Sequence, residues 1–188
     1  MRIILASQSA FRKRALDILG LKYETTPSSI DEKAIRDSDP MALARKLSEA
    51  KAKAVGEKNP DSIVIASDLL VTLGNKVYEK PENEEDAFRM LRSYSGKEVS
   101  VITGLAIYNS ATMKLLSTAV KDTAKFRSLT DSEIRDYMAR YPVLKCAGAF
   151  EGDGLLRFSE SFSGKLAFLT ALPINELVLF LRENGVNV

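Results

Sequence analysis

Hydrophobic and polar positions along this chain predict strands and helices in alternation. The apolar run RIILA, residues 2–6, predicts a buried strand, and residues 9–19 predict a helix directly after it. Asp39 and Pro40 form a typical helix start, a capping side chain followed by a proline in the first turn. Apolar residues then recur at intervals of three and four up to Gly56, which predicts a second amphipathic helix.

The same reasoning covers the rest of the chain. In chain order it first predicts two strands over 62–78 joined by a Gly74–Asn75 turn, and then a helix from Pro81 to about Gly96. Paired long strands over 99–109 and 114–129 follow, and a capping box at Thr130 begins a helix that ends at about Tyr141. The chain continues with a glycine-rich loop over 146–154, further strands, and a last helix over about 174–183. This mixture predicts an α/β or α+β fold with a strongly curved mixed sheet flanked by helices. Without a clear linker, residues 1–188 are expected to form a single domain of two lobes.

Composition narrows the class of protein. The chain carries 27 basic and 25 acidic residues, a balance too even for general binding to nucleic acids or membrane surfaces. The N-terminal apolar run is too short for a signal peptide, and no apolar stretch reaches the roughly 18 residues that would span a bilayer. Cys146 is the only cysteine, so an internal disulfide is impossible. A cytoplasmic location is therefore expected.

The chain contains no histidine. This absence excludes Ser-His-Asp and Cys-His catalytic groups as well as histidine-based metal sites. A general base must be a carboxylate, lysine, tyrosine or the one cysteine. A bound metal must be held by oxygen atoms, which favours magnesium or manganese.

Arg12 is the first candidate for binding an anion. Leu16 and Leu19 follow it at helical spacing, so Arg12 lies on the stripe of the helix that faces the core. The amides at a helix N-terminus bind phosphate readily, and the hydroxyls of Ser7 and Ser9 can add donors. Pairing of Arg12 with a structural carboxylate is an equally good interpretation of this segment alone.

Asp68 and Lys51 are charged residues in apolar surroundings. Asp68 interrupts the strand-like run IVIASDLLV, and an unpaired buried carboxylate is costly, so Asp68 is expected to meet a cation, a metal or a helix cap. A functional role is favoured because perturbed acids cluster at functional sites. Lys51 lies beside the apolar face of its helix, where a lysine that extends its ammonium to solvent is the simpler interpretation.

Three further candidates are weaker when taken singly. Glu32 lies in a polar segment. Lys80 precedes a proline that stiffens the chain, and its side chain could point into one cleft with Asp68. The EGDG segment, residues 151–154, combines flexible backbone with carboxylates, which suits a metal or the N–H edge of a guanine base. An ordinary surface charge explains Glu32 equally well, a free surface lysine is the commoner interpretation of Lys80, and an acidic surface turn is the simple interpretation of EGDG.

Taken together and in order, these segments resemble the Maf (septum-formation protein) family of nucleoside triphosphate pyrophosphatases. The resemblance runs along nearly the whole chain. It is carried by LASQSAFRKRAL, IDE, LSEAKAKAV, ASDLLV, EKP, AFRMLRSYSGK, VITG, FRSLTDSEIRDY, CAGAFEGDG and a late ALP.

The resemblance implies a fold shared with inosine-triphosphate pyrophosphatases, an elongated mixed sheet with two lobes around a central cleft. It also implies hydrolysis of a nucleoside triphosphate to the monophosphate and pyrophosphate. Asp68 would accept the proton of the attacking water, and Glu32 and Asp68 would hold a divalent Mg or Mn ion. Ser7, Arg12, Lys51 and Lys80 would bind the triphosphate, with Ser9 as an added donor.

Three positions matter for substrate choice in this family, and here they hold Phe11, Leu69 and Asp153. The branch acting on dTTP and UTP has arginine, threonine and glutamine there. The branch acting on 7-methyl-GTP has an aromatic residue, glutamine and glutamate. Phe11 can stack on a cationic purine and Asp153 can accept from the guanine edge, so the 7-methyl-GTP branch is favoured. Leu69 departs from it by lacking one hydrogen-bonding group.

Other functions remain open at this point. The chain can be a dTTP/UTP pyrophosphatase of the same family, or a non-catalytic nucleotide-binding regulator of cell division. A third possibility is a nucleotide-binding sensor without catalytic activity. Such a sensor would keep the phosphate-binding cations and the base pocket but could lose Asp68, and this chain has Asp68. The resemblance further implies a homodimer, a role in cell division arrest, and exclusion of modified nucleotides from nucleic acids.

Overall fold

The computed structural model describes residues 1–152 and 154–188, and Asp153 lies outside the described residues. The chain folds into two compact units. The first consists of Met1–Asp68, Thr103–Val120 and Ala167–Val188, and the second consists of Leu69–Ile102 and Lys121–Leu166.

The described residues form a seven-stranded mixed sheet in the order β2-β1-β3-β5-β6-β7, with β4 paired to β3. Strand β1 is parallel to both β2 and β3, whereas the β3–β4 and β6–β7 pairs are antiparallel. The strands are β1 (Arg2–Leu5), β2 (Glu24–Thr25), β3 (Ser62–Leu73), β4 (Lys76–Tyr78), β5 (Glu98–Asn109), β6 (Lys114–Phe126) and β7 (Ser159–Ser163). The mixed α/β class expected from the sequence is confirmed, although β6 ends before the expected residue 129 and the short β2 was not predicted.

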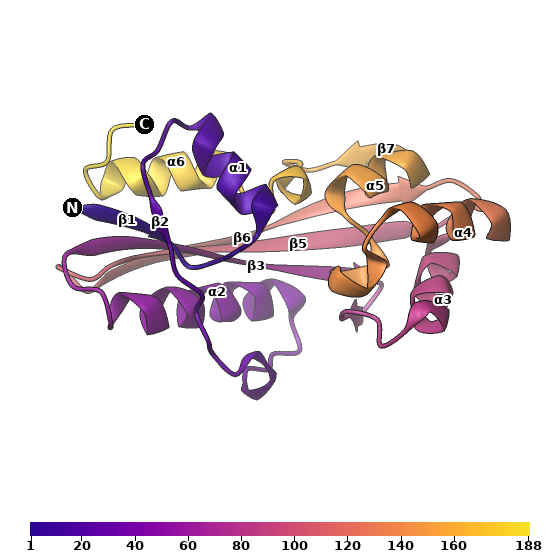
Figure 1. Cartoon of the computed structure of the whole chain (residues 1–188), viewed down its shortest axis with the longest axis horizontal. Helices are drawn as coiled ribbons and strands as arrows, with labels where there is room; N and C mark the ends of the chain where they lie inside the picture. The colour runs from indigo at the N-terminus through magenta and orange to yellow at the C-terminus, as the bar shows by residue number, and fades with distance from the viewer. The chain divides into compact units, whose positions relative to one another are not determined.

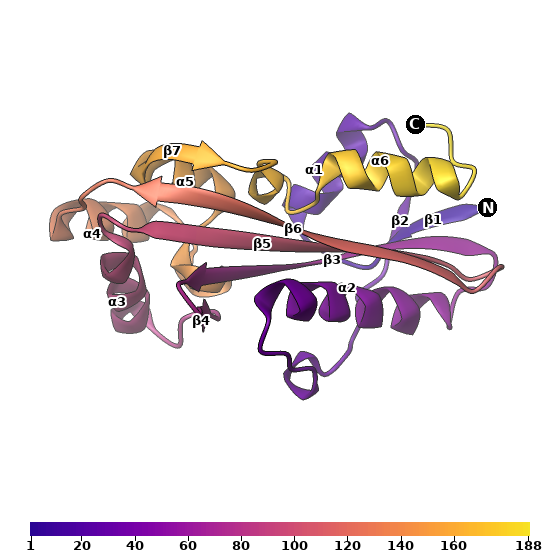
Figure 2. The same cartoon turned by 180° about the vertical axis from the view of Figure 1, so that it is seen from behind.

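The first unit has helices on both faces of its strands. Helices α1 (Ala10–Ile18) and α6 (Ile174–Glu183) cover one face, and α2 (Pro40–Gly56) covers the other (Figures 1 and 2). The strand period of two sends alternate residues to these faces. In β3, Ile63 and Ile65 pack in the core under α1 and α6, while Val64 and Ala66 pack in the core under α2.

Helix α2 begins as the sequence predicts. The Asp39 carboxylate accepts hydrogen bonds from the backbone N–H groups of Met41 and Ala42, and Pro40 occupies the first turn. The helix lies very close to β5, because a Cβ added to Gly104 would meet the backbone carbonyl oxygen of Ala44. Glycine at this position therefore sets the distance between α2 and the sheet.

The second unit has an aromatic core. Helices α3 (Glu84–Tyr94), α4 (Asp131–Arg140) and α5 (Gly152–Phe158) contribute to it, and the 3-10 turns η2 (Val143–Lys145) and η3 (Ala147–Ala149) follow α4. Tyr94 lies at its centre, with ring centroids 5.2–5.9 Å from those of Tyr78, Phe126 and Phe150. The ring of Phe158 packs 6.0 Å from that of Phe126. Such edge-on, tilted and stacked pairs add to the free energy of burial.

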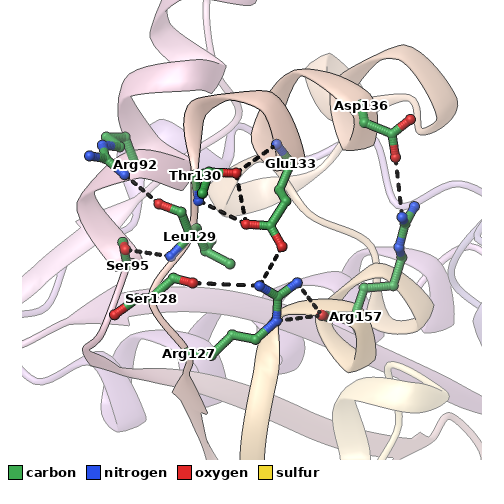
Figure 3. A network of polar contacts seen from close by, with 9 residues as sticks. All are labelled: Arg92, Ser95, Arg127, Ser128, Leu129, Thr130, Glu133, Asp136 and Arg157. Carbon is green, nitrogen blue, oxygen red and sulfur yellow. Dashed lines mark hydrogen bonds and ion pairs between the residues drawn. The ribbon is translucent and has the colours of Figure 1, made fainter.

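The link between β6 and α4 is held by a polar network (Figure 3). Thr130 and Glu133 form the predicted capping box, each side chain bonding to the other residue's backbone N–H. Arg127 donates to Glu133 Oε1 at 2.6 Å and to the carbonyl oxygen of Arg157. The network fixes the start of α4 against the end of α5.

One loop prediction needs correction. The EGDG segment, expected as a loop, contains the start of α5 at Gly152, because Leu155 and Phe158 are buried there and their packing outweighs the weak helix propensity of glycine. A Cβ on Gly154 would collide with the Tyr137 ring, so this glycine serves a close packing contact. The polar segment that contains Glu32 includes a short 3-10 turn, η1 (Glu32–Ala34), capped by Asp31.

Among the described residues, no helix combines the length and the apolar composition needed to cross a lipid bilayer.

Candidate active site

Asp68 lies in the interior of β3 and is only 7% exposed. Its position, two residues after Ala66 and four after Val64, directs it to the face covered by α2. There Lys51, also 7% exposed, donates from Nζ to Asp68 Oδ1 at 2.5 Å. Lys51 reaches this position because it lies one helical turn from both Leu47 and Val55, which are buried on the same stripe of α2.

Glu32 is the second carboxylate on the Lys51 ammonium. Its Oε1 lies 3.0 Å from Lys51 Nζ, and its side chain is 56% exposed. The 3-10 turn η1, capped by Asp31, places it there. One buried ammonium is therefore shared by two carboxylates, one buried and one open to solvent.

Arg12 anchors the other side of the site. Its Nη1 donates to Ser7 Oγ at 3.0 Å, and its Nε donates to the carbonyl oxygen of Ala171 at 3.2 Å. Burial lowers the pKa of the Arg12 guanidinium, and the carboxylates of Asp68 and Glu32 oppose that shift. The guanidinium carries five N–H donors, so those not used in these two bonds can meet an anion.

Ser7 and Ser9 lie at the N-terminus of α1. Ser7 Oγ accepts from the backbone N–H of Ser9 at 3.2 Å as well as from Arg12, so its own hydroxyl proton is available to a ligand. Ser9 is the N-cap residue, and its side chain makes no capping hydrogen bond. The first amides of α1 therefore add to the partial positive charge around Arg12.

The four charged groups balance one another. Arg12 and Lys51 supply two positive charges, and Glu32 and Asp68 supply two negative ones. A polyanion alone would face two carboxylates, and a divalent cation alone would face two cations. The arrangement therefore favours a ligand that carries both kinds of charge, such as a metal–polyphosphate complex.

The donor set fits magnesium or manganese. Glu32 and Asp68 offer carboxylate oxygens, and Mg²⁺ is commonly held by one or two carboxylates together with substrate phosphates and waters. Within the described residues, no group of three or more acidic, cysteine or histidine side chains could hold a metal without such help. The protein's contribution to a metal site would thus be incomplete until a phosphate ligand joins it.

The remaining predicted residues divide between the two units. Phe11 is half-buried on α1, next to Arg12. Leu69 and Lys80 belong to the second unit, where Leu69 is half-buried and Lys80 is exposed. Asp153, predicted to contact the base, lies outside the described residues.

Lys80 has an electrostatic neighbour within the second unit. Burial raises the pKa of the Cys146 thiol to about 11, with Glu151 acting in the same direction and Lys80 in the opposite one. The carbonyl oxygen of Glu79, the residue before Lys80, accepts from the backbone N–H of Gly148 at 3.0 Å. This bond ties the Lys80 segment to the glycine-containing turn η3.

Sequence reasoning assigned no role to Ser67 or to the Ala171 carbonyl. Ser67 Oγ donates to the same Ala171 oxygen that Arg12 contacts, at 2.9 Å. A serine inside an otherwise apolar strand, directly before Asp68, was the signal that could have pointed to Ser67. Nothing in the identity of an alanine indicates that its carbonyl is an acceptor at a site.

Comparison with solved structures places the fold. The Ham1 protein of Staphylococcus aureus matches with a TM-score of 0.56 and 13% identity, covering 98% of this chain and all of that one. A HAM1 protein from Coxiella burnetii gives a TM-score of 0.51 at 14% identity, and the match covers 97% of this chain and 99% of that one. The chain thus has the Ham1-type fold, the inosine-triphosphate-pyrophosphatase-like class expected from the sequence.

The sequence comparison is more specific. The profile of the family described as Maf-like protein matches residues 2–184, so the chain belongs to the Maf family. It is 38% identical to the 7-methyl-GTP pyrophosphatase of Pseudomonas aeruginosa over 99% of this chain and 98% of that protein. It is also 38% identical to the dTTP/UTP pyrophosphatase of Aquifex aeolicus, over 97% of this chain and 95% of that protein. The expected family is confirmed.

Proposed function

We propose that this Maf-family nucleotide pyrophosphatase hydrolyses 7-methyl-GTP to the monophosphate and pyrophosphate. The observation that carries the hydrolysis is the buried Asp68 carboxylate bonded to Lys51, with Glu32 and Arg12 around it. A carboxylate can accept the proton of an attacking water, and the two cations can stabilise negative charge on the phosphate oxygens. This chemistry requires no histidine, and the chain has none.

The residues of the first unit divide the work. Arg12, Ser7 and Ser9, with the N-terminal amides of α1, bind phosphate oxygens, and Lys51 moves from the carboxylates to the triphosphate as it enters. Asp68 and Glu32 would then hold the divalent ion. When bound, that ion neutralises charge on the phosphates and the leaving pyrophosphate. Lys80 of the second unit is proposed as a further phosphate ligand.

The base preference is supported by two observations. Phe11 is half-buried beside Arg12, where an aromatic face attracts a cationic purine such as 7-methylguanine more strongly than a neutral base. Several similar relatives, including those of Pseudomonas aeruginosa and Alcanivorax borkumensis, carry the name 7-methyl-GTP pyrophosphatase. Leu69 and Asp153 are proposed as the other specificity residues.

A dTTP/UTP pyrophosphatase is the second candidate. The relative from Aquifex aeolicus with that name is as similar, at 38% identity, as the 7-methyl-GTP relative from Pseudomonas aeruginosa. The two candidates share the phosphate chemistry and differ only in the base pocket. A homodimer, a cytoplasmic location and a role in cell division remain predictions of the family resemblance.

A pyrophosphate-release assay with Mg²⁺ or Mn²⁺ tests the proposal. The panel is 7-methyl-GTP, GTP, UTP, dTTP, CTP, 5-methyl-UTP and ITP. We expect 7-methyl-GTP to give the highest kcat/KM. A preference for dTTP and UTP would retain the reaction and overturn the assignment of Phe11.

Asp68→Asn tests the catalytic base. We expect it to lower kcat by roughly 10²- to 10⁴-fold, the usual contribution of a positioned general base. Asp37→Asn is the matched control, because Asp37 also pairs with a lysine of α2, Lys46, at 2.6 Å, with a side chain that is 20% exposed against 10% for Asp68. Circular dichroism of both variants verifies folding. Full turnover in a folded Asp68→Asn protein would remove Asp68 from the mechanism. No turnover of any nucleotide by the wild type would favour the non-catalytic regulator.

A further inference from the structure

We infer that Ser67 is a positioning residue that orients the phosphate-binding guanidinium of Arg12 through the backbone carbonyl of Ala171. The inference rests on the proposed function for the role of Arg12. Ser67 directly precedes Asp68, the catalytic carboxylate, and its inferred task is to position Arg12.

The carbonyl oxygen of Ala171 receives two hydrogen bonds. Ser67 Oγ donates at 2.9 Å and Arg12 Nε donates at 3.2 Å. Ser67 is fully buried, so its hydroxyl has no water to replace this acceptor. The two donors come from β3 and α1, and they meet at an oxygen that belongs to the segment before α6.

The conformation of Ala171 makes this carbonyl depend on its partners. Ala171 has φ of +51°, in the left-handed region that a residue with a Cβ enters at a cost. Leu172, the next residue, is fully buried in the core with Leu177 and Leu181, which fixes one side of the turn. The bond from Ser67 fixes the direction of the carbonyl on the other side.

Two fixed points define the plane of the guanidinium. Nε is held by Ala171, and Nη1 is held by Ser7 Oγ at 3.0 Å. Because the guanidinium is planar and rigid, these two bonds set the direction of every remaining N–H donor. Loss of the hydrogen bond from Ser67 would allow the Ala171 carbonyl to rotate. This rotation would weaken the hydrogen bond that holds Arg12 Nε.

The period of β3 lets neighbouring residues serve the two sides of the site. Ser67 follows Ile63 and Ile65 on the face covered by α1 and α6, whereas Asp68 follows Val64 and Ala66 on the face covered by α2. Consecutive residues of one strand thus orient Arg12 and present the catalytic carboxylate. Their spacing is set by the backbone and is insensitive to side-chain motion.

The first experiment is a double-mutant cycle on triphosphate hydrolysis. We expect Ser67→Ala to raise KM roughly 3- to 10-fold, the effect of one neutral hydrogen bond, with a smaller change in kcat. In an Arg12→Lys background, where no Nε is present, the same substitution should leave KM unchanged. Ser67→Cys, which fills the site with a slightly larger group that donates weakly, should give an intermediate KM and guards against misfolding of the alanine variant.

Ser62→Ala is the matched control. Ser62 is also a fully buried serine of β3, and its Oγ donates to a backbone carbonyl, that of Asn59, at 2.6 Å. It is the first residue of β3, five residues before Ser67. We expect this variant to lose some stability without a change in KM.

A second measurement does not depend on turnover. The Nε–H of Arg12, followed by ¹⁵N NMR, should exchange with solvent slowly in the wild type and in Ser62→Ala, and roughly tenfold faster in Ser67→Ala. An unchanged exchange rate in Ser67→Ala would overturn the inference, as would a KM effect that persists in full in the Arg12→Lys background. If the wild type hydrolyses no nucleotide, the proposed function fails while the exchange rate still decides the role of Ser67.

Discussion

Lys51 shows how much a single residue depends on its surroundings. The sequence favoured a lysine that extends its ammonium to solvent, and the structure instead buries that ammonium between Asp68 and Glu32. A buried ion pair gains little net free energy from its own attraction, because both charges lose their hydration. Such a pair is well suited to a site whose ligand can take over one of the partners.

The pairing predicts that Lys51 competes with the divalent ion. Without nucleotide, Lys51→Met should bind Mn²⁺ roughly tenfold more tightly than the wild type, since removing a competing ion pair of about 1.4 kcal/mol corresponds to that factor. Electron paramagnetic resonance of free Mn²⁺ measures the affinity directly. The wild-type affinity should rise when a non-hydrolysable triphosphate occupies Lys51.

Lys46→Met serves as the control for this effect. Lys46 is on the same helix and pairs with Asp37, so the variant removes an equal charge away from the site. Equal Mn²⁺ affinities for the wild type, Lys46→Met and Lys51→Met would show that Lys51 does not restrict access to the carboxylates.

At the scale of elements, the start of α4 depends on local interactions that can be predicted from the sequence. The TDSE segment predicts a capping box, and the structure contains it with both reciprocal hydrogen bonds. These bonds, from the Thr130 backbone and hydroxyl and then from Arg127, lower the pKa of Glu133 to about 2. The sequence could not show the contribution of Arg127, which precedes the helix and also contacts the end of α5.

This shift gives a pH-dependent prediction. Because the pKa of Glu133 is lower in the folded protein than in the unfolded chain, its stabilisation is present in full above the ordinary value of 4.5 and is lost as the pH falls through about 2. Thr130→Ala should lower the free energy of unfolding by about 1 kcal/mol at pH 7 and raise the Glu133 pKa.

Chemical denaturation from pH 7 to pH 2, with NMR titration of the Glu133 carboxyl, measures both effects. Ser132→Ala, in the same first turn but outside the capping box, is the control and should match the wild type. A Glu133 pKa that stays near 2 in Thr130→Ala would show that the backbone N–H of residue 130 and Arg127 sustain the shift without the threonine hydroxyl.

At the scale of the whole molecule, the two units share continuous strands. The unit boundaries at Asp68/Leu69, Ile102/Thr103 and Val120/Lys121 fall inside β3, β5 and β6. Neither unit can therefore lose its part of these strands without disturbing a strand that continues into the other. The expectation is one cooperative unfolding transition despite two compact units.

Thiol labelling tests this expectation. Cys146 is half-buried in the second unit, and its pKa of about 11 keeps the thiol largely protonated and slow to react near pH 7. Pulsed labelling of Cys146 across a urea gradient should give the same midpoint as far-UV circular dichroism of the whole chain. Labelling at a clearly lower urea concentration would show that the second unit opens independently.

The sequence by itself determined the elements, the family and most of the candidate residues. Caps, turns and periodicity are local, so the starts of α2 and α4 and the succession of strands were predictable to within a few residues. Asp68 could be singled out because burying a carboxylate among the apolar residues of a strand is costly.

Only the tertiary structure decided which groups meet. That Lys51 joins Asp68 to Glu32 depends on how α2 packs against β3, and that Ser67 and Arg12 share one oxygen depends on a turn more than 100 residues further along the chain. That turn places an alanine at positive φ, and its acceptor is a backbone carbonyl, a group every residue has. Such contacts leave no trace in residue type, because the packing of distant segments, and not local preference, brings them together.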